Sequence, residues 1–120
     1  MIDKSLSSLV FEFKLKVYKF LAITTEKGIY FKVLETLRTE ERQRELFRSG
    51  KSQTMGSKHL LGKAVDVVPV MDYDYPKVRE LLWRPDHKIW TTVKEVAETC
   101  DLTWGGNWVG FPDYFHLQDR

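Results

Sequence analysis

The feature that most constrains this chain is a short apolar strand pattern with one acidic residue inside it. Residues Ala64–Val68 are small or β-branched, which is typical of a buried strand, and Asp66 lies at their centre. Side chains alternate along a strand, so Asp66 shares one face with Ala64 and Val68. A buried carboxylate is costly unless another group neutralises it. The fold must therefore bring a partner to Asp66.

Two histidines are candidates for that partner. His59 precedes Asp66 across a short loop, and His116 lies in the C-terminal pattern Phe115–Gln118. Alternation in this pattern puts His116 and Gln118 on one face and two apolar side chains on the other. Two imidazoles and a carboxylate are the ligands of a zinc site that keeps one position open for water or substrate. The spacing alone leaves metal binding and a structural role open, because His-x6-Asp is not a specific pattern.

Several separated blocks, in a consistent order, make a more specific pattern. They are Leu37–Thr39 with Gln43 and Leu46–Gly50, then Ser57-x-His59-x2-Gly62-x-Ala64-x-Asp66, and finally Trp104–Trp108 followed by Asp113-x2-His116-x-Gln118. Together they resemble the signature of the LAS metallopeptidases, which include D-alanyl-D-alanine peptidases, and in particular the phage endolysin branch of L-alanyl-D-glutamate peptidases. The resemblance covers residues from about 34 to 118, so the first thirty or so residues are interpreted from pattern alone.

The resemblance implies the chemistry of the site. It implies that His59, Asp66 and His116 hold a zinc ion, and that Asp113 serves as general base and then general acid in amide hydrolysis. From the sequence pattern alone, Asp113 could instead be a turn residue that follows Pro112.

Two residues near position 40 match the family in the same way. The resemblance implies that Arg38 clamps a substrate carboxylate or stabilises negative charge on the attacked carbonyl. The alternative is a surface arginine that pairs with Glu40 or Glu41. Gln43 also matches the family, although a glutamine on a helix surface would explain it almost as well.

Four further residues are candidates for substrate binding or for supporting the ligands: Ser57, Trp104, Trp108 and Gln118. Ser57 could hydrogen-bond substrate or orient a ligand, or simply stabilise a turn. The two tryptophans lie close to glycines and could form a groove wall, but plain core packing is equally open. Cys100 could be a ligand, although we expect a small buried hydrophobe.

The substrate implied by the resemblance is the L-alanyl-D-glutamate bond of the bacterial peptidoglycan stem peptide. Such a zinc-dependent endopeptidase would be an endolysin, a bacteriophage enzyme that lyses the host cell. One alternative is a D-alanyl-D-alanine carboxypeptidase or dipeptidase of the same fold. The other is an inactive, metal-containing module that binds the cell wall.

Length and charge indicate the domain organisation, the partners and the location of the protein. We expect residues 1–120 to form a single peptidase domain, without a separate wall-binding domain, that acts as a monomer. The 19 basic and 17 acidic residues nearly balance, which argues against nucleic-acid binding by bulk charge. Charges interrupt the apolar stretch Leu9–Ile23, so we expect neither a signal peptide nor membrane insertion. The protein would be made in the host cytoplasm and act on the periplasmic or extracellular wall after release across the membrane.

The pattern as a whole predicts an α+β fold: a small, mostly antiparallel sheet with the zinc site on one face and helices packed on the other. The helices are expected to run from Ser7 or Ser8 to Gly28, from Thr39 to Ser49, and from His87 to Cys100. The expected strands cover 29–37, 64–68, 102–104 and 115–118. Pro69 is expected to end the second strand, 71–76 to form a turn-rich connection with solvated Asp72 and Asp74, and 78–83 to form a short helix.

Overall fold

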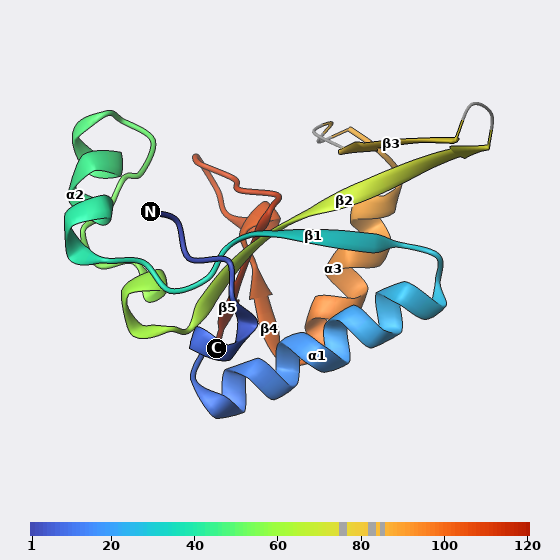
Figure 1. Ribbon diagram of the computed structural model, residues 1–120, viewed down its shortest axis with the longest axis horizontal. Coiled ribbons are helices and arrows are strands. Elements are labelled where there is room, and N and C mark those ends of the chain that lie inside the picture. The colour runs from blue at the N-terminus through green and yellow to red at the C-terminus, as the bar shows by residue number, and fades with distance from the viewer. Residues whose placement is uncertain (75–76, 82–83, 85) are drawn as a thin grey trace.

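The computed structural model describes residues 1–74, 77–81, 84 and 86–120. Its strands are β1 (Tyr30–Glu35), β2 (Ala64–Asp74), β3 (Lys77–Leu81), β4 (Leu102–Trp104) and β5 (His116–Asp119). Its helices are α1 (Phe11–Glu26), α2 (Glu40–Arg48) and α3 (Ile89–Thr99), with 3₁₀ turns η1 (Leu6–Ser8), η2 (Lys58–Leu61) and η3 (Gly105–Asn107) (Figure 1). The strands pair antiparallel in the order β1-β2-β5-β4, and β3 also pairs with β2. The predicted α+β fold with an antiparallel sheet is confirmed.

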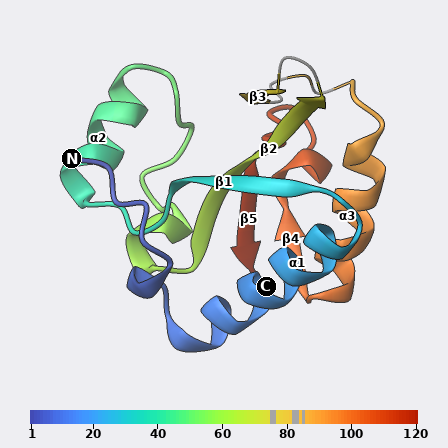
Figure 2. The ribbon, with the colours of Figure 1, turned by 45° about the vertical axis from the view of Figure 1, so that its right-hand side comes forward.

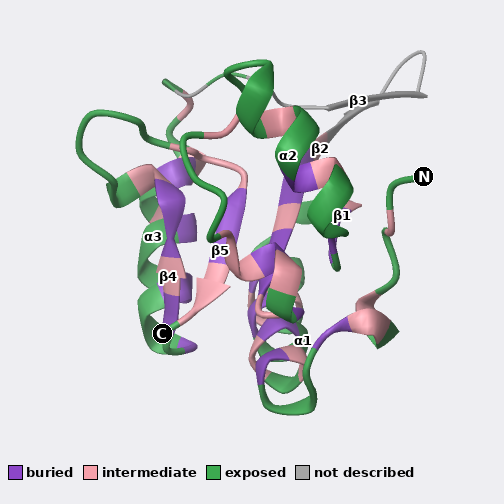
Figure 3. Cartoon of the chain, turned by 90° about the vertical axis from the view of Figure 1, so that its left-hand side faces the viewer, coloured by how far each residue is buried: buried purple, intermediate pink, exposed green. Residues whose placement is uncertain are grey.

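One face of the sheet carries the hydrophobic core, and helices α1 and α3 supply much of the rest of that core (Figure 2). In α1 the residues Phe13, Val17 and Phe20 recur at helical spacing and are fully buried. The sheet contributes Val65 and Val67 from β2. Helix α2 stands apart from the other two helices, and Gln43 is its buried residue (Figures 1 and 3). Helices α1 and α3 therefore do not cover the opposite face of β2, which carries Asp66.

The three helices follow the sequence prediction with small shifts. Thr39 caps α2, because its hydroxyl oxygen accepts a hydrogen bond from the Arg42 N–H at 3.1 Å. Helix α3 begins at Ile89, whose N–H donates to Nδ1 of His87 at 3.2 Å. Gly28 follows α1 with φ +79°, a left-handed conformation that glycine adopts without steric cost. In the described part of the chain, no helix combines the length and apolar character needed to cross a bilayer.

The start of α1 differs from the prediction. The helix begins at Phe11 rather than at Ser7 or Ser8, because residues 6–8 form the separate turn η1. Val10 is extended, and its N–H donates to the carbonyl of Gly62 at 3.0 Å. This contact ties the beginning of α1 to the loop that precedes β2.

Strand β2 continues past Pro69, so the prediction that this proline ends the strand is wrong. Val67 donates its N–H to the carbonyl of Phe115 at 2.8 Å, on the edge of β2 that pairs with β5. Backbone N–H groups alternate along a strand, so the nitrogen of Pro69 faces this same edge. Pairing with β5 covers β2 through Asp66, and pairing with β3 begins at Val70. Pro69 thus lies between the two partners, where no ladder hydrogen bond is lost.

Strand β3 occupies much of the segment predicted as a short helix over 78–83. That prediction is wrong for residues 78–81, whereas 82 and 83 lie outside the described residues. Residues 71–74, predicted to belong to a turn-rich connection, extend β2 and pair with β3, and residues 75–76 lie outside the described residues. Asp72 and Asp74 are therefore strand residues. Both errors arise because an antiparallel partner supplies backbone hydrogen bonds that local sequence preference does not reveal.

Candidate active site

The register of the sheet brings Asp66 and His116 together. Asp66 in β2 lies directly opposite His116 in β5, and Ala64 lies opposite Gln118, so all four side chains share one face. The intervening pair of residues points into the hydrophobic core. The face predicted from strand alternation is thus formed by two neighbouring strands.

His59 reaches Asp66 from the 3₁₀ turn η2. Ser57 caps this turn, because its hydroxyl oxygen accepts the N–H of His59 at 3.2 Å. Gly62 ends the turn with φ +69°, and a Cβ at this position would lie 3.1 Å from the carbonyl oxygen of Ser8. The serine and glycine of the sequence motif therefore shape the turn that presents His59.

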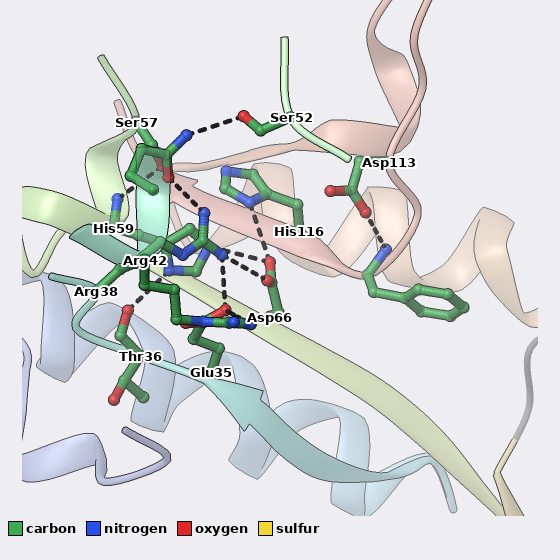
Figure 4. A network of polar contacts seen from close by, with 12 residues as sticks. Glu35, Thr36, Arg38, Arg42, Ser52, Ser57, His59, Asp66, Asp113 and His116 are labelled. Carbon is green, nitrogen blue, oxygen red and sulfur yellow. Dashed lines mark hydrogen bonds and ion pairs between the residues drawn. The ribbon is translucent and has the colours of Figure 1, made fainter. Parts of the chain in front are cut away.

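Hydrogen bonds on the outer ring nitrogens orient both imidazoles. His59 Nδ1 lies 2.7 Å from the carbonyl oxygen of Thr36, which can only accept, so Nδ1 carries the hydrogen. His116 Nε2 donates to Gln118 Oε1 at 2.9 Å. The inner nitrogen of each ring, Nε2 of His59 and Nδ1 of His116, therefore faces Asp66 (Figure 4).

The three groups converge on a small volume. Asp66 Oδ1 lies 3.2 Å from His59 Nε2 and 3.1 Å from His116 Nδ1, and these atoms all lie within 4.8 Å of one another. Burial alone would raise the pKa of Asp66, but hydrogen bonds to His116 and His59 outweigh it and hold this pKa well below its usual range. Three converging acceptors need a cation to balance them, either a proton on a ring or a metal ion. Two imidazoles and a carboxylate, with both outer nitrogens hydrogen-bonded, fit a metal site of the zinc type.

Arg38 lies beside the other oxygen of the Asp66 carboxylate. Its Nη2 is 3.5 Å from Asp66 Oδ2 and 2.8 Å from Glu35 Oε1. The side chain of Arg38 is 8% exposed and lines the cleft described below. Its ionic partners are thus Glu35 and Asp66 rather than Glu40 or Glu41, and Asp66 Oδ1 stays turned toward the histidines.

Gln43 is completely buried, so the alternative of a helix-surface glutamine is wrong. Its Oε1 accepts a hydrogen bond from Arg38 Nη1 at 2.8 Å. Its Nε2 donates to Ser52 Oγ at 2.9 Å and to the carbonyl oxygen of Thr54 at 2.5 Å. Gln43 therefore joins Arg38 to the loop that leads to Ser57, and it supports the site from behind.

Glu35 and Arg42 belong to the site, although neither was predicted from the sequence. Glu35 is 4% exposed and binds both Arg38 and Arg42, the latter at 2.6 Å between Nε and Oε2. A β-bulge between Val33 and Glu35 shifts the register and places Glu35 opposite Asp66. Without the bulge, Glu35 would share the core-facing side of Val33. The available signal was an acidic residue at an apolar position of the strand pattern.

Asp113 lies in the turn before β5 and lines the cleft. Its N–H donates to the carbonyl of Gly105 at 2.9 Å, and its Oδ1 accepts the N–H of Phe115 at 3.2 Å. A Cβ at Gly105 would collide with the carbonyl oxygen of Asp113, so this close approach requires glycine. Burial, and then the nearby charge of Asp66, raises the pKa of Asp113. A raised pKa suits a carboxylate that accepts and returns a proton.

The two candidate tryptophans occupy different environments. Trp104 is 6% exposed, stacks on Trp90 with ring centroids 6.0 Å apart, and donates from Nε1 to the carbonyl of Tyr114 at 2.8 Å. It is a core residue rather than a groove wall. Trp108 is 37% exposed, and its ring centroid lies 4.9 Å from that of His116. Of the two, Trp108 forms part of the cleft wall.

A cleft of about 610 Å³ lies over these groups, a volume within the usual range for small-ligand sites. Eight of the ten candidate residues line it: Arg38, Ser57, His59, Asp66, Trp108, Asp113, His116 and Gln118. The other two, Gln43 and Trp104, lie behind its wall. The structure therefore brings the predicted carboxylates, imidazoles and the Arg38 guanidinium to a single concave surface.

Comparisons with known proteins agree with this arrangement. A model of the M15 peptidase family, described as D-alanyl-D-alanine carboxypeptidase, matches residues 50–119. The L-alanyl-D-glutamate peptidase of Listeria phage A118 is 38% identical in an alignment of 103 residues, and the match covers 83% of this chain and 34% of that protein. The peptidoglycan L-alanyl-D-glutamate endopeptidase CwlK of Bacillus subtilis (strain 168) is 27% identical in an alignment of 113 residues, and the match covers 81% of this chain and 65% of that protein.

A solved structure extends the similarity to the fold. The crystal structure of the Serratia marcescens L-Ala D-Glu endopeptidase ChiX matches with a TM-score of 0.73 and 33% sequence identity. The match covers 96% of this chain and 83% of that one. By contrast, the chain spans about a third of the phage relative and just under two thirds of the Bacillus relative.

Proposed function

Because the chain belongs to the M15 peptidase family, of the LAS type, we propose that it is a peptidoglycan endopeptidase that hydrolyses the L-alanyl-D-glutamate bond of the stem peptide. The observation that carries this proposal is the convergence of His59, Asp66 and His116 in a cleft that also holds Asp113 and Arg38. Relatives named for this bond in a phage, in Bacillus and in Serratia support the choice of substrate.

We propose zinc as the metal of this site. His59 Nε2, Asp66 Oδ1 and His116 Nδ1 would hold it, because these three atoms already lie within 4.8 Å of one another. When bound, zinc would polarise the scissile carbonyl and lower the pKa of the attacking water. Hydrogen bonds from the outer ring nitrogens to Thr36 and Gln118 would keep both imidazoles in the ligating orientation.

The remaining chemistry falls to two side chains. Asp113, whose pKa is raised by burial, would accept a proton from the attacking water and pass it to the leaving amine. Arg38 would stabilise negative charge that develops on the carbonyl oxygen. Glu35 and Gln43 fix the guanidinium of Arg38 in advance, so little reorganisation would be needed.

A second candidate is cleavage of a D-alanyl-D-alanine bond, because the matching family model carries that description. Both reactions would use the same metal, base and arginine, and they differ in the residues that flank the scissile amide. The bond can therefore be assigned only from the products.

The test is mass spectrometry of purified peptidoglycan after digestion, with a chelator, without it, and with zinc restored. We expect new fragments that end in L-alanine, together with free amino groups on D-glutamate. These products should vanish with chelator and return with zinc. Release of D-alanine would instead assign the carboxypeptidase reaction, and the absence of any product would favour a wall-binding role.

We further propose that the enzyme acts in host cell lysis during phage release, which requires passage across the inner membrane to reach the wall. The phage origin of one relative supports this setting. Directing the protein to the periplasm by an added signal sequence should lower culture turbidity, and the Asp113→Asn variant directed in the same way should not. Equal lysis by both proteins would contradict an enzymatic cause.

A further inference from the structure

Two guanidinium groups bind the same carboxylate at the cleft, but they differ in how far they are exposed. Figure 4 shows Arg38 and Arg42 against Glu35. Arg38 is 8% exposed, with one terminal nitrogen bonded to Gln43 and the other to Glu35. Arg42 is 29% exposed and borders the same cleft. A ligand in the cleft therefore has better access to Arg42.

Arg42 also keeps unused hydrogen-bond donors. Its Nε donates to Glu35 Oε2 at 2.6 Å and its Nη2 to Glu35 Oε1 at 3.3 Å. A guanidinium has five N–H donors, so these two bonds leave three. Among the described residues, Nη1 of Arg42 has no hydrogen-bond partner. One edge of the planar group is thus held by a buried carboxylate, while donors remain on the rest of the group for an anion.

The bond to be cut supplies such an anion. A glutamate residue whose nitrogen belongs to the scissile amide has two carboxyl groups, and only one of them can continue the peptide. The other remains as a free carboxylate on the leaving side of the bond. If it is the α-carboxylate, its carbon lies only about 2.5 Å from the scissile nitrogen, because two covalent bonds separate them.

We propose that Arg42 binds this free carboxylate and thereby selects glutamate on the leaving side of the scissile bond. This inference rests on the proposed function. A short series of contacts places Arg42 near the reacting groups: Asp66 Oδ2 to Arg38 Nη2 at 3.5 Å, and then Glu35 Oε1, which accepts from both arginines. The carboxylate site is thus connected to Asp66 through Arg38 and Glu35.

Other cations that line the cleft are less suited to this role. The Nζ of Lys58 donates to the carbonyl of Asp119 at 2.6 Å, which holds this ammonium at the end of β5. Lys51 is exposed, and no side-chain hydrogen bond orients it among the described residues. Arg42 is oriented by Glu35 before any substrate binds, which lowers the entropic cost of binding.

The test compares two synthetic stem peptides that differ in one group: one has the free glutamate carboxylate and the other has a carboxamide in its place. We expect the wild-type protein to prefer the carboxylate. Arg42→Gln should lower kcat/KM for the carboxylate peptide by roughly 10- to 100-fold, because a charge-assisted bidentate contact is lost. The carboxamide peptide should be cleaved nearly as well by the variant as by the wild type.

The matched control is Arg44→Gln, which removes the same charge from the same helix. Arg44 is 47% exposed, pairs weakly with Glu40 at 3.8 Å, and lies outside the cleft lining. It should behave as wild type with both peptides. Bound zinc in Arg42→Gln should remain close to wild type, because Arg42 is not a ligand. The melting temperature should fall only by the loss of one of the two Glu35 ion pairs, because Arg38 continues to bind Glu35.

Equal losses on both peptides, or a preference for carboxylate that survives in Arg42→Gln, would overturn the proposal. Loss of the preference in Lys51→Gln instead would transfer the role to Lys51. If the wild-type protein cleaves neither peptide, the proposed function fails, and calorimetric binding of the uncleaved peptides still tests Arg42. The wild-type protein must then bind the carboxylate peptide more tightly than the carboxamide peptide, and Arg42→Gln must lose this preference. A wild-type protein that binds both peptides equally would also overturn the proposal.

Discussion

The two histidines beside Asp66 are supported in different ways. His59 sits on the turn η2, and its outer nitrogen donates to a backbone carbonyl, that of Thr36. His116 sits on strand β5, and its outer nitrogen donates to a side chain, that of Gln118. One ligand therefore depends on the path of the main chain, and the other depends on the identity of a neighbouring residue. Mutation can remove the second support directly but not the first.

The largest effect is expected for zinc binding itself, which should depend equally on both histidines. His59→Ala, Asp66→Ala and His116→Ala should each abolish stoichiometric zinc binding, because each removes one of three converging ligand atoms. Metal content after dialysis, measured by mass spectrometry, checks this. His87→Ala is the matched control, because His87 contacts the first residue of α3, Ile89, and lies outside the cleft lining. A ligand variant that keeps full zinc occupancy would remove that residue from the set.

The next largest effect is a loss of catalytic rate at Asp113, in the turn that precedes His116. Asp113→Asn should lower kcat by about 10²- to 10⁴-fold, because the amide cannot accept the proton from the attacking water. Asparagine keeps an oxygen that can accept the N–H of Phe115, so the turn should persist. Zinc content should equal that of wild type. A parallel loss of zinc and activity would mean that Asp113 is a ligand or a structural residue instead.

The groups that hold the outer nitrogens, Gln118 for His116 and the Thr36 carbonyl for His59, allow a direct test of whether the two histidines are supported differently. Gln118→Ala should weaken zinc binding by about 10- to 100-fold, because it frees the ring of His116. Thr36→Val removes the hydroxyl that bonds to Asp3 but keeps the carbonyl that holds His59, so no comparable change is expected. Titration against a competing chelator measures both affinities. Equal weakening in the two variants would show that the distinction between the supports is wrong.

The smallest effect is a change in acid stability at Glu35. Burial alone would raise the pKa of Glu35, but Arg38 and Arg42 outweigh it and lower this pKa. Its ion pairs therefore stabilise the fold above the ordinary carboxyl pKa of about 4.3, and this contribution is lost as the pH falls through the lower folded-state value. Glu35→Gln should reduce the free energy of unfolding by about 1–3 kcal/mol at neutral pH.

Denaturant unfolding at several pH values measures this effect. The gap between wild type and Glu35→Gln should narrow as the medium becomes more acidic, because protonation of Glu35 removes the same charge in the wild type. A gap that stays constant below pH 4 would indicate that packing, and not charge, accounts for the contribution of Glu35.

The sequence by itself determined which face of its strand Asp66 and His116 each occupy. Strand alternation assigns a face to each residue before any partner is known, and the apolar residues around them leave the polar face for the site. Local chemistry likewise defined the start of α2 at Thr39 and the left-handed Gly28 after α1. These features depend on residues that are close in sequence, which explains why pattern suffices for them.

Only the tertiary structure decided which residues surround the Asp66–His116 pair. The bulge before Glu35 turned an apparent core position toward Asp66, and the partners of β2 allowed Pro69 to remain inside a strand. Packing likewise sent Trp104 into the core and left Trp108 on the cleft. Each outcome depends on contacts between segments far apart in the chain, and a one-residue change of register reverses the face of every later side chain. Local sequence patterns do not contain that information.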